Sequence, residues 1–566
     1  MPRVESSAWS LPALGPNLTA WVGGEMSGTN SGDALSEIMA AVRQEDRPRA
    51  LALAVAAWRG GGSHPLVLML AAEALEAQGE ADQAIGLLKA ALAVSDEPEL
   101  WRRYGAALAR GQQFADAAEA FEEALDIDGS DLAALRGAAA ARFQGGEMAA
   151  ADAAYRRILA LAPQDLGALT GLAAVAVRRR QFDEARGFAR QALAAAPGDL
   201  SASMTLARAD LLEGRAERAA AQASALLARP DLGLEPGIAL LDLRAEALDA
   251  LDRPAEAFAD YAERNARIER GAEAEIRAMG ERRIDQARRL QAFFAGQDPA
   301  AWRTPPQAGA DDAPVKGHVF LLGFPRSGTT LLEKALASHP QASSLEEIDH
   351  LDAAAGDLLA TEAGLGELLT LSAAQAAARR ARYWEGVGAT VGGELSGKVV
   401  VDKMPLHTLA LPLIARLFPG ARILFALRDP RDVALSCFRR RFQLNSAMYE
   451  FLTPERTAAY YDAVMTLGML YRDRLPLALC EVRHEAVVAD FDAEVAKVLA
   501  FIGLDWDPAV RGFAARAQAR ARTPSDLQLV GGLSDAGIGQ WRRYERQLTP
   551  VRPILDRWAE RFGYAP

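Results

Sequence analysis

A glycine-containing segment in the second half of the chain has the spacing of a phosphate-binding loop. The run from Gly323 to Thr330 reads GFPRSGTT, follows an apolar stretch and opens a helical one. Backbone N–H groups of such a loop, with the N-terminus of the following helix, hold phosphate oxygens. Thr329 stands at the usual lysine position, and Arg326 supplies a cation inside the loop instead. The residues predicted to bind an anion are Arg326, Ser327, Gly328, Thr329 and Thr330.

A second anion site is predicted further along the chain. The apolar run 421–427 ends at Arg428, and Ser436 follows on helical text within RDPRDVALS. Ligands of open α/β sheets bind at such strand ends, where a guanidinium and a hydroxyl suit a second phosphate group. Seven arginines lie between Arg416 and Arg441 against two aspartates, in a chain of net charge −12. A solvated, arginine-rich helix face is the alternative interpretation.

Short apolar runs alternate with amphipathic segments around these residues. Strands are predicted at 318–324, 398–401, 421–427 and 477–482. Helices are predicted at 328–338, 372–386, 406–417, 431–441 and 455–474. The alternation predicts a P-loop-like α/β domain over 317–566, with a parallel sheet covered by helices on both faces.

The two motifs, taken in this order, resemble the family of sulfotransferases that use 3′-phosphoadenylyl sulfate (PAPS). The resemblance covers about residues 316–566, and HPQASSLEEIDHL and VDKMPLHTLALPLIARLFPGARILFALRDPRD are similar to text of the tyrosylprotein and bacterial tetratricopeptide members. It implies PAPS as co-substrate and no metal. It also implies transfer of a sulfuryl group to a hydroxyl acceptor, and protein tyrosine is one candidate acceptor.

The resemblance also implies roles for single residues. Glu347 matches the catalytic base and Lys403 the lysine that stabilises the transferring group. Arg428, Ser436 and Arg440 match the contacts to the 3′-phosphate. Sulfuryl transfer requires a base that takes the proton of the acceptor, and cations on the sulfuryl group and on the leaving phosphate. Lys403 and Arg326 supply these cations. Glu346 competes as the base, and both acids could instead cap a helix at 348–358.

Some positions depart from the pattern of the family. His484 stands where a tyrosine near the nucleotide is usual. The segments RTPS (522–525) and GQWRRY (539–544) resemble the loop that closes over PAPS, with Gln540 in place of a basic residue. The spacing within this loop leaves two candidates, Thr523 and Ser525, for the residue whose hydroxyl contacts PAPS. Trp541, like Tyr544, either lines the adenine or anchors the loop.

The first half of the chain carries a repeat of 34 residues. Pro163 and Pro197 are 34 apart, Gly129 lies one period upstream, and small and large apolar residues keep the same register between them. This spacing predicts antiparallel helix pairs, so a tetratricopeptide solenoid is expected over 32–294, with its clearest repeats at 98–199. Such arrays bind peptides or stabilise a neighbouring domain. Residues 1–31 are predicted to be disordered, Met26 is a candidate start, and 295–316 form a linker.

The composition excludes several classes of protein. Half of the residues are hydrophobic and 24% are charged, as in globular proteins, and the net negative charge argues against nucleic acid as a partner. No apolar run reaches the roughly 18 residues of a membrane span. Two cysteines and six scattered histidines support neither a disulfide framework nor a zinc site, so a cytoplasmic location is expected. Two alternatives stay open: a repeat scaffold with a non-catalytic nucleotide-binding domain, and a P-loop kinase, which Thr329 disfavours.

Overall fold

The structure is a computed structural model, and it describes residues 29–303, 314–392, 395–519, 529 and 531–565. Contacts divide the chain into two compact units, one ending at Ala247 and one running from Leu248 to Pro566. The first unit is helical, and the second contains the sheet.

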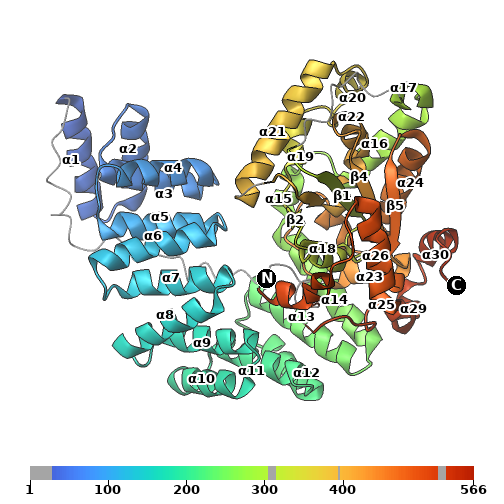
Figure 1. The fold of residues 1–566 in the computed structure, drawn as a ribbon. Helices are drawn as coiled ribbons and strands as arrows, with labels where there is room; N and C mark the ends of the chain where they lie inside the picture. Colours follow the sequence, from blue (N-terminus) through green and yellow to red (C-terminus); the bar gives the residue numbers. More distant parts are fainter. Residues whose placement is uncertain (1–28, 304–313, 393–394, 520–528, 530, 566) are drawn as a thin grey trace. The chain divides into compact units, whose positions relative to one another are not determined.

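The first unit consists of helix pairs, and four of these pairs follow one another with a constant period (Figure 1). The first helices of four successive pairs begin at residues 98, 132, 166 and 200, and the second helices at 114, 148, 182 and 216, so both series repeat every 34 residues. The predicted tetratricopeptide period is therefore confirmed. The helices are α5 (Pro98–Arg110), α6 (Phe114–Ile127), α7 (Leu132–Gln144), α8 (Met148–Leu161), α9 (Leu166–Arg178), α10 (Phe182–Ala195), α11 (Leu200–Leu212) and α12 (Ala216–Leu227), preceded by α1 (Thr29–Arg43), α2 (Arg47–Arg59), α3 (Pro65–Ala77) and α4 (Ala81–Leu92).

Side-chain contacts repeat with the same period. A Cβ atom added at Gly137 would lie 2.4 Å from the ring of Phe121, and one added at Gly171 would lie 2.4 Å from the ring of Tyr155. An aromatic ring on the second helix of one pair thus packs against a glycine on the first helix of the next. Equivalent aspartates cap the first helices α7, α9 and α11. These capping residues are Asp131, Asp165 and Asp199.

The second unit contains a parallel five-stranded sheet in the order β2-β3-β1-β4-β5. The strands are β1 (Gly317–Gly323), β2 (Ala342–Ser344), β3 (Val399–Lys403), β4 (Arg422–Leu427) and β5 (Ala478–Arg483). The α/β fold and four predicted strands are confirmed, whereas sequence reasoning missed the three-residue β2. Because β1 lies between β3 and β4, the strand order reverses beside it, and ligands of such sheets bind at that point.

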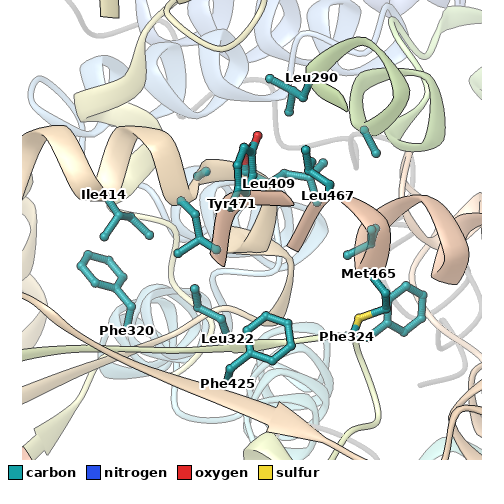
Figure 2. Close-up of a cluster of buried hydrophobic side chains, with 14 of the residues drawn as sticks. Leu290, Phe320, Leu322, Phe324, Leu409, Ile414, Phe425, Met465, Leu467 and Tyr471 are labelled. Carbon is teal, nitrogen blue, oxygen red and sulfur yellow. The ribbon is translucent and has the colours of Figure 1, made fainter. Parts of the chain in front are cut away.

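Helices cover both faces of this sheet. On one face, strand residues such as Phe320 and Phe425 belong to a large apolar cluster with α16 (Arg283–Ala295), α21 (Ala373–Val391), α22 (Leu411–Leu417) and α24 (Pro454–Arg474). Figure 2 shows these two rings beneath Leu409, Leu467 and Tyr471. On the other face, the alternate strand residues pack against α18 (Thr329–Ala337) and α26 (Phe491–Ile502). Alternation with period two is typical of strands.

Helices before the predicted linker belong to the sheet-bearing unit. The structure groups 248–294 with the sheet, so the predicted boundary at 295–316 lies inside this unit. The reason is packing: Leu290 and Phe294 of α16 and Trp302 of α17 (Pro299–Arg303) are at most 1% exposed within the main cluster. Residues 304–313 of the predicted linker lie outside the described residues.

Two predictions concern the start of the chain and the membrane. Residues 29–31, placed in the predicted disordered segment, belong to α1, and residues 1–28, including Met26, lie outside the described residues. Within the part of the chain that the structure describes, no helix is both long and apolar enough to cross a membrane.

Candidate functional site

The phosphate-loop motif connects β1 to α18 and has an unusual backbone. Gly323, Arg326 and Gly328 have φ values of 150°, 72° and 92°. A non-glycine residue in the left-handed region is strained and is common at functional sites. Left-handed residues turn successive N–H groups toward one concavity, which suits an anion. The next two residues, Thr329 and Thr330, are buried in the first turn of α18.

Three arginines lie around this loop. The Nε atom of Arg326 donates to Oγ of Ser436 at 3.0 Å, and Nη1 of Arg428 donates to the carbonyl oxygen of Arg326 at 3.2 Å. Burial, followed by the charges of Arg440, Arg428 and Arg439, lowers the pKa of Arg326 to about 9. The structure therefore brings together the loop, Arg428 and Ser436, as the sequence predicts.

The charges of Arg428 and Arg440 are poorly compensated within the described part of the chain. Among the described residues, neither Arg428 nor Arg440 has an ion pair with a carboxylate, and the buried Nε atom of Arg428 has no hydrogen-bond partner. Like charges held close together, with an unsatisfied donor among them, cost free energy that a bound anion would recover. The cluster is thus a candidate site for a polyanion.

His484 lies directly against the loop. It begins α25 (His484–Ala489) at the end of β5, and a Cβ atom added at Gly328 would lie 2.5 Å from its Nδ1 atom. Within the described structure this Nδ1 is buried without a hydrogen-bond partner. Burial and the charges of Arg428 and Arg326 lower the pKa of His484 to about 3, so the imidazole is neutral near pH 7. Its contact with a nucleotide stays a prediction.

A lysine and two carboxylates form a second group at the same edge of the sheet. Lys403 ends β3 and is 2% exposed; its Nζ atom lies 2.6 Å from Oε1 of Glu347 and 3.1 Å from Oε2 of Glu333. Burial alone would lower the pKa of Lys403, but the two carboxylates outweigh it and raise the pKa. The side chain of Glu347 is 45% exposed, so a substrate can reach it.

The neighbouring acid faces a different lysine. Glu346 has a φ of 55°, and its Oε1 atom lies 3.4 Å from Nζ of Lys334. Its side chain is 23% exposed, about half the value for Glu347. The backbone therefore directs the two consecutive carboxylates to two different lysines. Glu347 pairs with Lys403, and Glu346 pairs with Lys334. The helix expected at 348–358 is shorter than predicted: α19 spans only Leu351–Ala355.

Sequence reasoning missed Glu333, which lies on α18 one turn after the loop. Its side chain is 1% exposed, and it accepts a hydrogen bond of 2.7 Å from Oγ of Ser344 in addition to its ion pair with Lys403. The only signal in the sequence was an acid within the largely apolar segment TTLLEKALA. The structure buries all nine of these residues, and a buried carboxylate needs a partner.

A buried histidine behind the loop of Glu347 was also missed. The Nε2 atom of His407 lies 3.0 Å from Oδ1 of Asp349, and its Nδ1 lies 3.6 Å from Oδ1 of Asp402. The hydroxyl of Tyr383 donates to the other carboxylate oxygen of Asp402 at 2.8 Å. Burial opposes protonation, but the two acids outweigh it and raise the pKa of His407. The imidazole of His407 thus anchors the chain two residues after Glu347.

The segment near the C-terminus closes over Arg428. The carbonyl oxygen of Gly537 accepts a hydrogen bond from Arg428, and the N–H of Trp541 donates to Asp432 at 2.8 Å. The Trp541 ring is 2% exposed, with the Arg431 guanidinium 3.9 Å from its centroid. These are the contacts of a loop anchor, and a contact with adenine stays a prediction. The two candidate hydroxyl residues, Thr523 and Ser525, lie outside the described residues.

The parts of the candidate site share one edge of the sheet. The phosphate loop follows β1, Lys403 ends β3, Arg428 follows β4 and His484 follows β5. Since all these strands are parallel neighbours, their carboxyl ends lie together (Figure 1). The arrangement combines a loop whose backbone suits an anion, a cluster of arginines and an exposed carboxylate that pairs with a buried lysine.

Comparison with known proteins agrees with this arrangement. Residues 318–508 match the model of the sulfotransferase family. The C-terminal region therefore contains a sulfotransferase-family domain, and the resemblance seen in the two motifs is confirmed. The match ends before the segment that carries Trp541 and begins after α16 and α17.

Two curated relatives and two solved structures are similar to parts of the chain. The chain is 26% identical over 261 residues to an uncharacterized protein of Aquifex aeolicus (43% of this chain, 33% of that protein). It is 29% identical over 281 residues to nodulation protein NoeE of Sinorhizobium fredii (44% and 64%), so it spans less than two thirds of either relative.

The two solved structures are each similar to less than half of the chain. A tetratricopeptide repeat protein from Parabacteroides merdae is 16% identical with a TM-score of 0.37, covering 42% of this chain and 93% of that one. PilW, a type IV pilus biogenesis factor, is 20% identical with a TM-score of 0.32, covering 37% and 98%. The repeat assignment rests on the helix spacing of this chain itself.

Proposed function

We propose that the C-terminal region transfers a sulfuryl group from PAPS to a hydroxyl acceptor. The observation that carries the proposal is the group of arginines around the phosphate loop: Arg428 and Arg440 have no ion pair with a carboxylate among the described residues, and their charges both act on Arg326. PAPS has a 5′-phosphosulfate and a separate 3′-phosphate. The loop with Arg326 suits the first group, and Arg428 with Ser436 and Arg440 suits the second. The family match supports this class of reaction.

The reaction assigns a role to each polar side chain. Glu347 accepts the proton of the acceptor hydroxyl while the acceptor oxygen bonds to sulfur. The bond between sulfur and the 5′-phosphate oxygen breaks, and its electron pair stays on the leaving adenosine 3′,5′-bisphosphate. Lys403 and Arg326 stabilise the negative charge on the sulfuryl oxygens and on the leaving phosphate. Glu333 keeps Lys403 charged and oriented, because it lies 3.1 Å from Nζ.

Nucleotide binding is tested by calorimetry with adenosine 3′,5′-bisphosphate. A charge-assisted hydrogen bond contributes roughly 1.5–3 kcal/mol, so Arg428→Ala should weaken binding about 10- to 150-fold. Arg422→Ala is the matched control, since Arg422 begins the same strand at its opposite end and donates to Ile502. Equal affinity of Arg428→Ala and the unaltered chain would contradict the assignment.

The base is tested by two neighbouring amide variants. Glu347→Gln should reduce turnover by about 10²–10⁴ and leave bisphosphate affinity nearly unchanged, because the amide cannot accept the proton. Glu346→Gln is the matched variant and should retain most of the turnover. A large loss with Glu346→Gln and a small one with Glu347→Gln would move the base by one residue.

Turnover also separates the alternative functions. A non-catalytic scaffold would bind the bisphosphate without releasing it from PAPS in the presence of an acceptor. A kinase would bind ATP with magnesium. The acceptor itself can be found by incubating a cell extract with the protein and isotopically labelled PAPS, followed by mass spectrometry.

The proposal extends to a protein acceptor, with tyrosine as the candidate residue, bound by the helix pairs of the first unit. Arrays of this kind bind peptides and raise the local concentration of a tethered substrate. A chain that begins at Leu234 keeps all of α13 (Leu234–Ala250) and the second unit. It should retain activity on small hydroxyl compounds and lose efficiency on the protein acceptor. Equal efficiency on that acceptor would reject the recruiting role. A cytoplasmic location belongs to the same proposal, since Cys437 and Cys480 are free thiols.

A further inference from the structure

We propose that Arg264 and Asn265, which lie outside the region that matches the family model, are positioning residues for the subsite of the 3′-phosphate. Both lie on α14 (Pro254–Gly271). The inference rests on the proposed function, because it concerns the arginine and serine assigned to that phosphate. It extends that function by adding a helix from the first half of the chain to the nucleotide site.

The contacts are made at the C-terminal end of α23 (Pro430–Arg439). Nη1 of Arg264 donates to the carbonyl oxygen of Arg439 at 2.9 Å, and Nη2 donates to that of Phe438 at 3.0 Å. Nδ2 of Asn265 donates to the same Phe438 oxygen at 3.2 Å. Arg264 is 0% exposed and Asn265 is 2% exposed. Two buried side chains therefore supply the donors for carbonyl groups at the end of this helix.

These carbonyls are the ones that a helix leaves without an internal partner. The last four C=O groups of an α-helix need donors from elsewhere, and a cation there also complements the negative end of the helix dipole. Arg264 supplies both a charge and two donors. The helix that it caps carries Ser436 in its last turn, and Arg440 follows directly. When this turn is held in place, the backbone positions from which the side chains of Ser436 and Arg440 extend are held in place as well.

The surrounding contacts separate the neighbouring arginines. Oδ2 of Asp249 lies 2.8 Å from Nη1 of Arg439, which directs this arginine toward the end of α13. Arg440 has no such carboxylate partner among the described residues, and it lines the same small cavity as Asn265. The Phe258 ring on α14 lies 4.8 Å from the Phe438 ring, centroid to centroid. Asp249 of α13 thus holds the Arg439 side chain, α14 holds the backbone at the end of α23, and Arg440 is left available for a ligand.

A general contribution to stability would affect all ligands alike, whereas a positioning role affects one phosphate. The experiment compares the affinities of the full chain for adenosine 3′,5′-bisphosphate and adenosine 5′-monophosphate, which lacks the 3′-phosphate. Arg264→Ala should reduce the ratio of these affinities by tenfold or more and change the monophosphate affinity by less than threefold. Arg264→Lys should give an intermediate ratio, because one ammonium cannot reproduce the paired geometry of the guanidinium.

Arg267→Ala on the same helix is the matched control, because Arg267 pairs with Glu263 and its side chain is 31% exposed. It should keep the original ratio. An unchanged ratio in the Arg264 variants, with both affinities retained or lowered equally, would overturn the inference and leave the proposed function standing. If the unaltered chain does not prefer the bisphosphate, the proposed function fails and the inference with it. Should Arg264→Ala not fold, Arg264→Lys and Asn265→Ala decide by the same ratio.

Discussion

Alanine at Gly328 should introduce two separate costs into the folded chain. The first is backbone strain, since a φ of 92° lies in the left-handed region, which costs an L-residue about 1–2 kcal/mol. The second is a collision. The new Cβ would lie 2.5 Å from Nδ1, 3.0 Å from Cγ and 3.1 Å from Cβ of His484. Overpacking of this kind costs about 1–3 kcal/mol, so the sum is roughly 2–5 kcal/mol.

A second substitution separates these costs. His484→Ala removes the atoms that collide and leaves the φ of residue 328 as it is. The variant Gly328→Ala with His484→Ala should therefore recover the collision cost of about 1–3 kcal/mol, relative to the sum of the two single changes, and retain the strain. No ligand is needed for this test, so its outcome does not depend on the proposed function.

Amide hydrogen exchange of β1 and α18 measures the effect in this unit alone. A loss of about 3 kcal/mol accelerates exchange through unfolding about 10²-fold. Gly366→Ala is the control, because Gly366 lies in α20 (Glu362–Leu369) and an added Cβ would have no atom within 4 Å. It should leave protection unchanged or increase it by up to about 1 kcal/mol. Normal protection in Gly328→Ala, or no recovery in the double variant, would refute the reasoning.

Three further predictions concern buried charges of the second unit. Glu333→Gln should lower the unfolding temperature, because Lys403 keeps only one carboxylate, and a double-mutant cycle with Lys403→Met should give a coupling of about 1–3 kcal/mol. Burial lowers the pKa of His318 to about 3, so between about pH 6.5 and pH 3 only the unfolded chain takes up a proton at this residue. The free energy of unfolding should therefore fall by up to about 4–5 kcal/mol as the pH is lowered through that range. In urea unfolding, His318→Gln should lose less stability over the same range. The pKa of His407 is raised in the folded chain, so protonation of His407 adds fully to the free energy of unfolding below about pH 6.5. This stabilisation is lost as the pH rises through the pKa of the folded chain. In melting curves from pH 6 to 9, His407→Gln should therefore lose less stability than the unaltered chain.

The sequence predicted the elements that have a strong period. Apolar runs of four to seven residues located β1, β3, β4 and β5 to within two residues at every end, because buried parallel strands need continuous apolar text. The repeat was visible because each helix pair must present the same apolar positions to the next pair. Strand β2 spans only Ala342–Ser344, which is too short to show a pattern.

Contacts across long sequence separations were the part that the sequence did not reveal. Arg264 reaches a carbonyl oxygen 175 residues away, and no local pattern distinguishes it from the arginines of exposed helix faces. The partner of Lys403 on α18 was missed for the same reason, since the sequence does not say which side of the loop helix faces β3. The family motifs singled out the residues that we propose to contact substrate, whereas the side chains that hold them come from elements with no motif.

The repeated aromatic-on-glycine contact has a consequence for how the array can change in length. Phe121 packs on Gly137 in one interface, and Tyr155 packs on Gly171 in the next, at the same offset. Excising or duplicating 34 residues between equivalent positions would therefore join an aromatic ring to a glycine again, and an aspartate would again begin the next helix. The contacts of the second unit start only at Leu248, so they would not be interrupted. Such an array can gain or lose whole repeats by recombination while the second unit keeps its own packing.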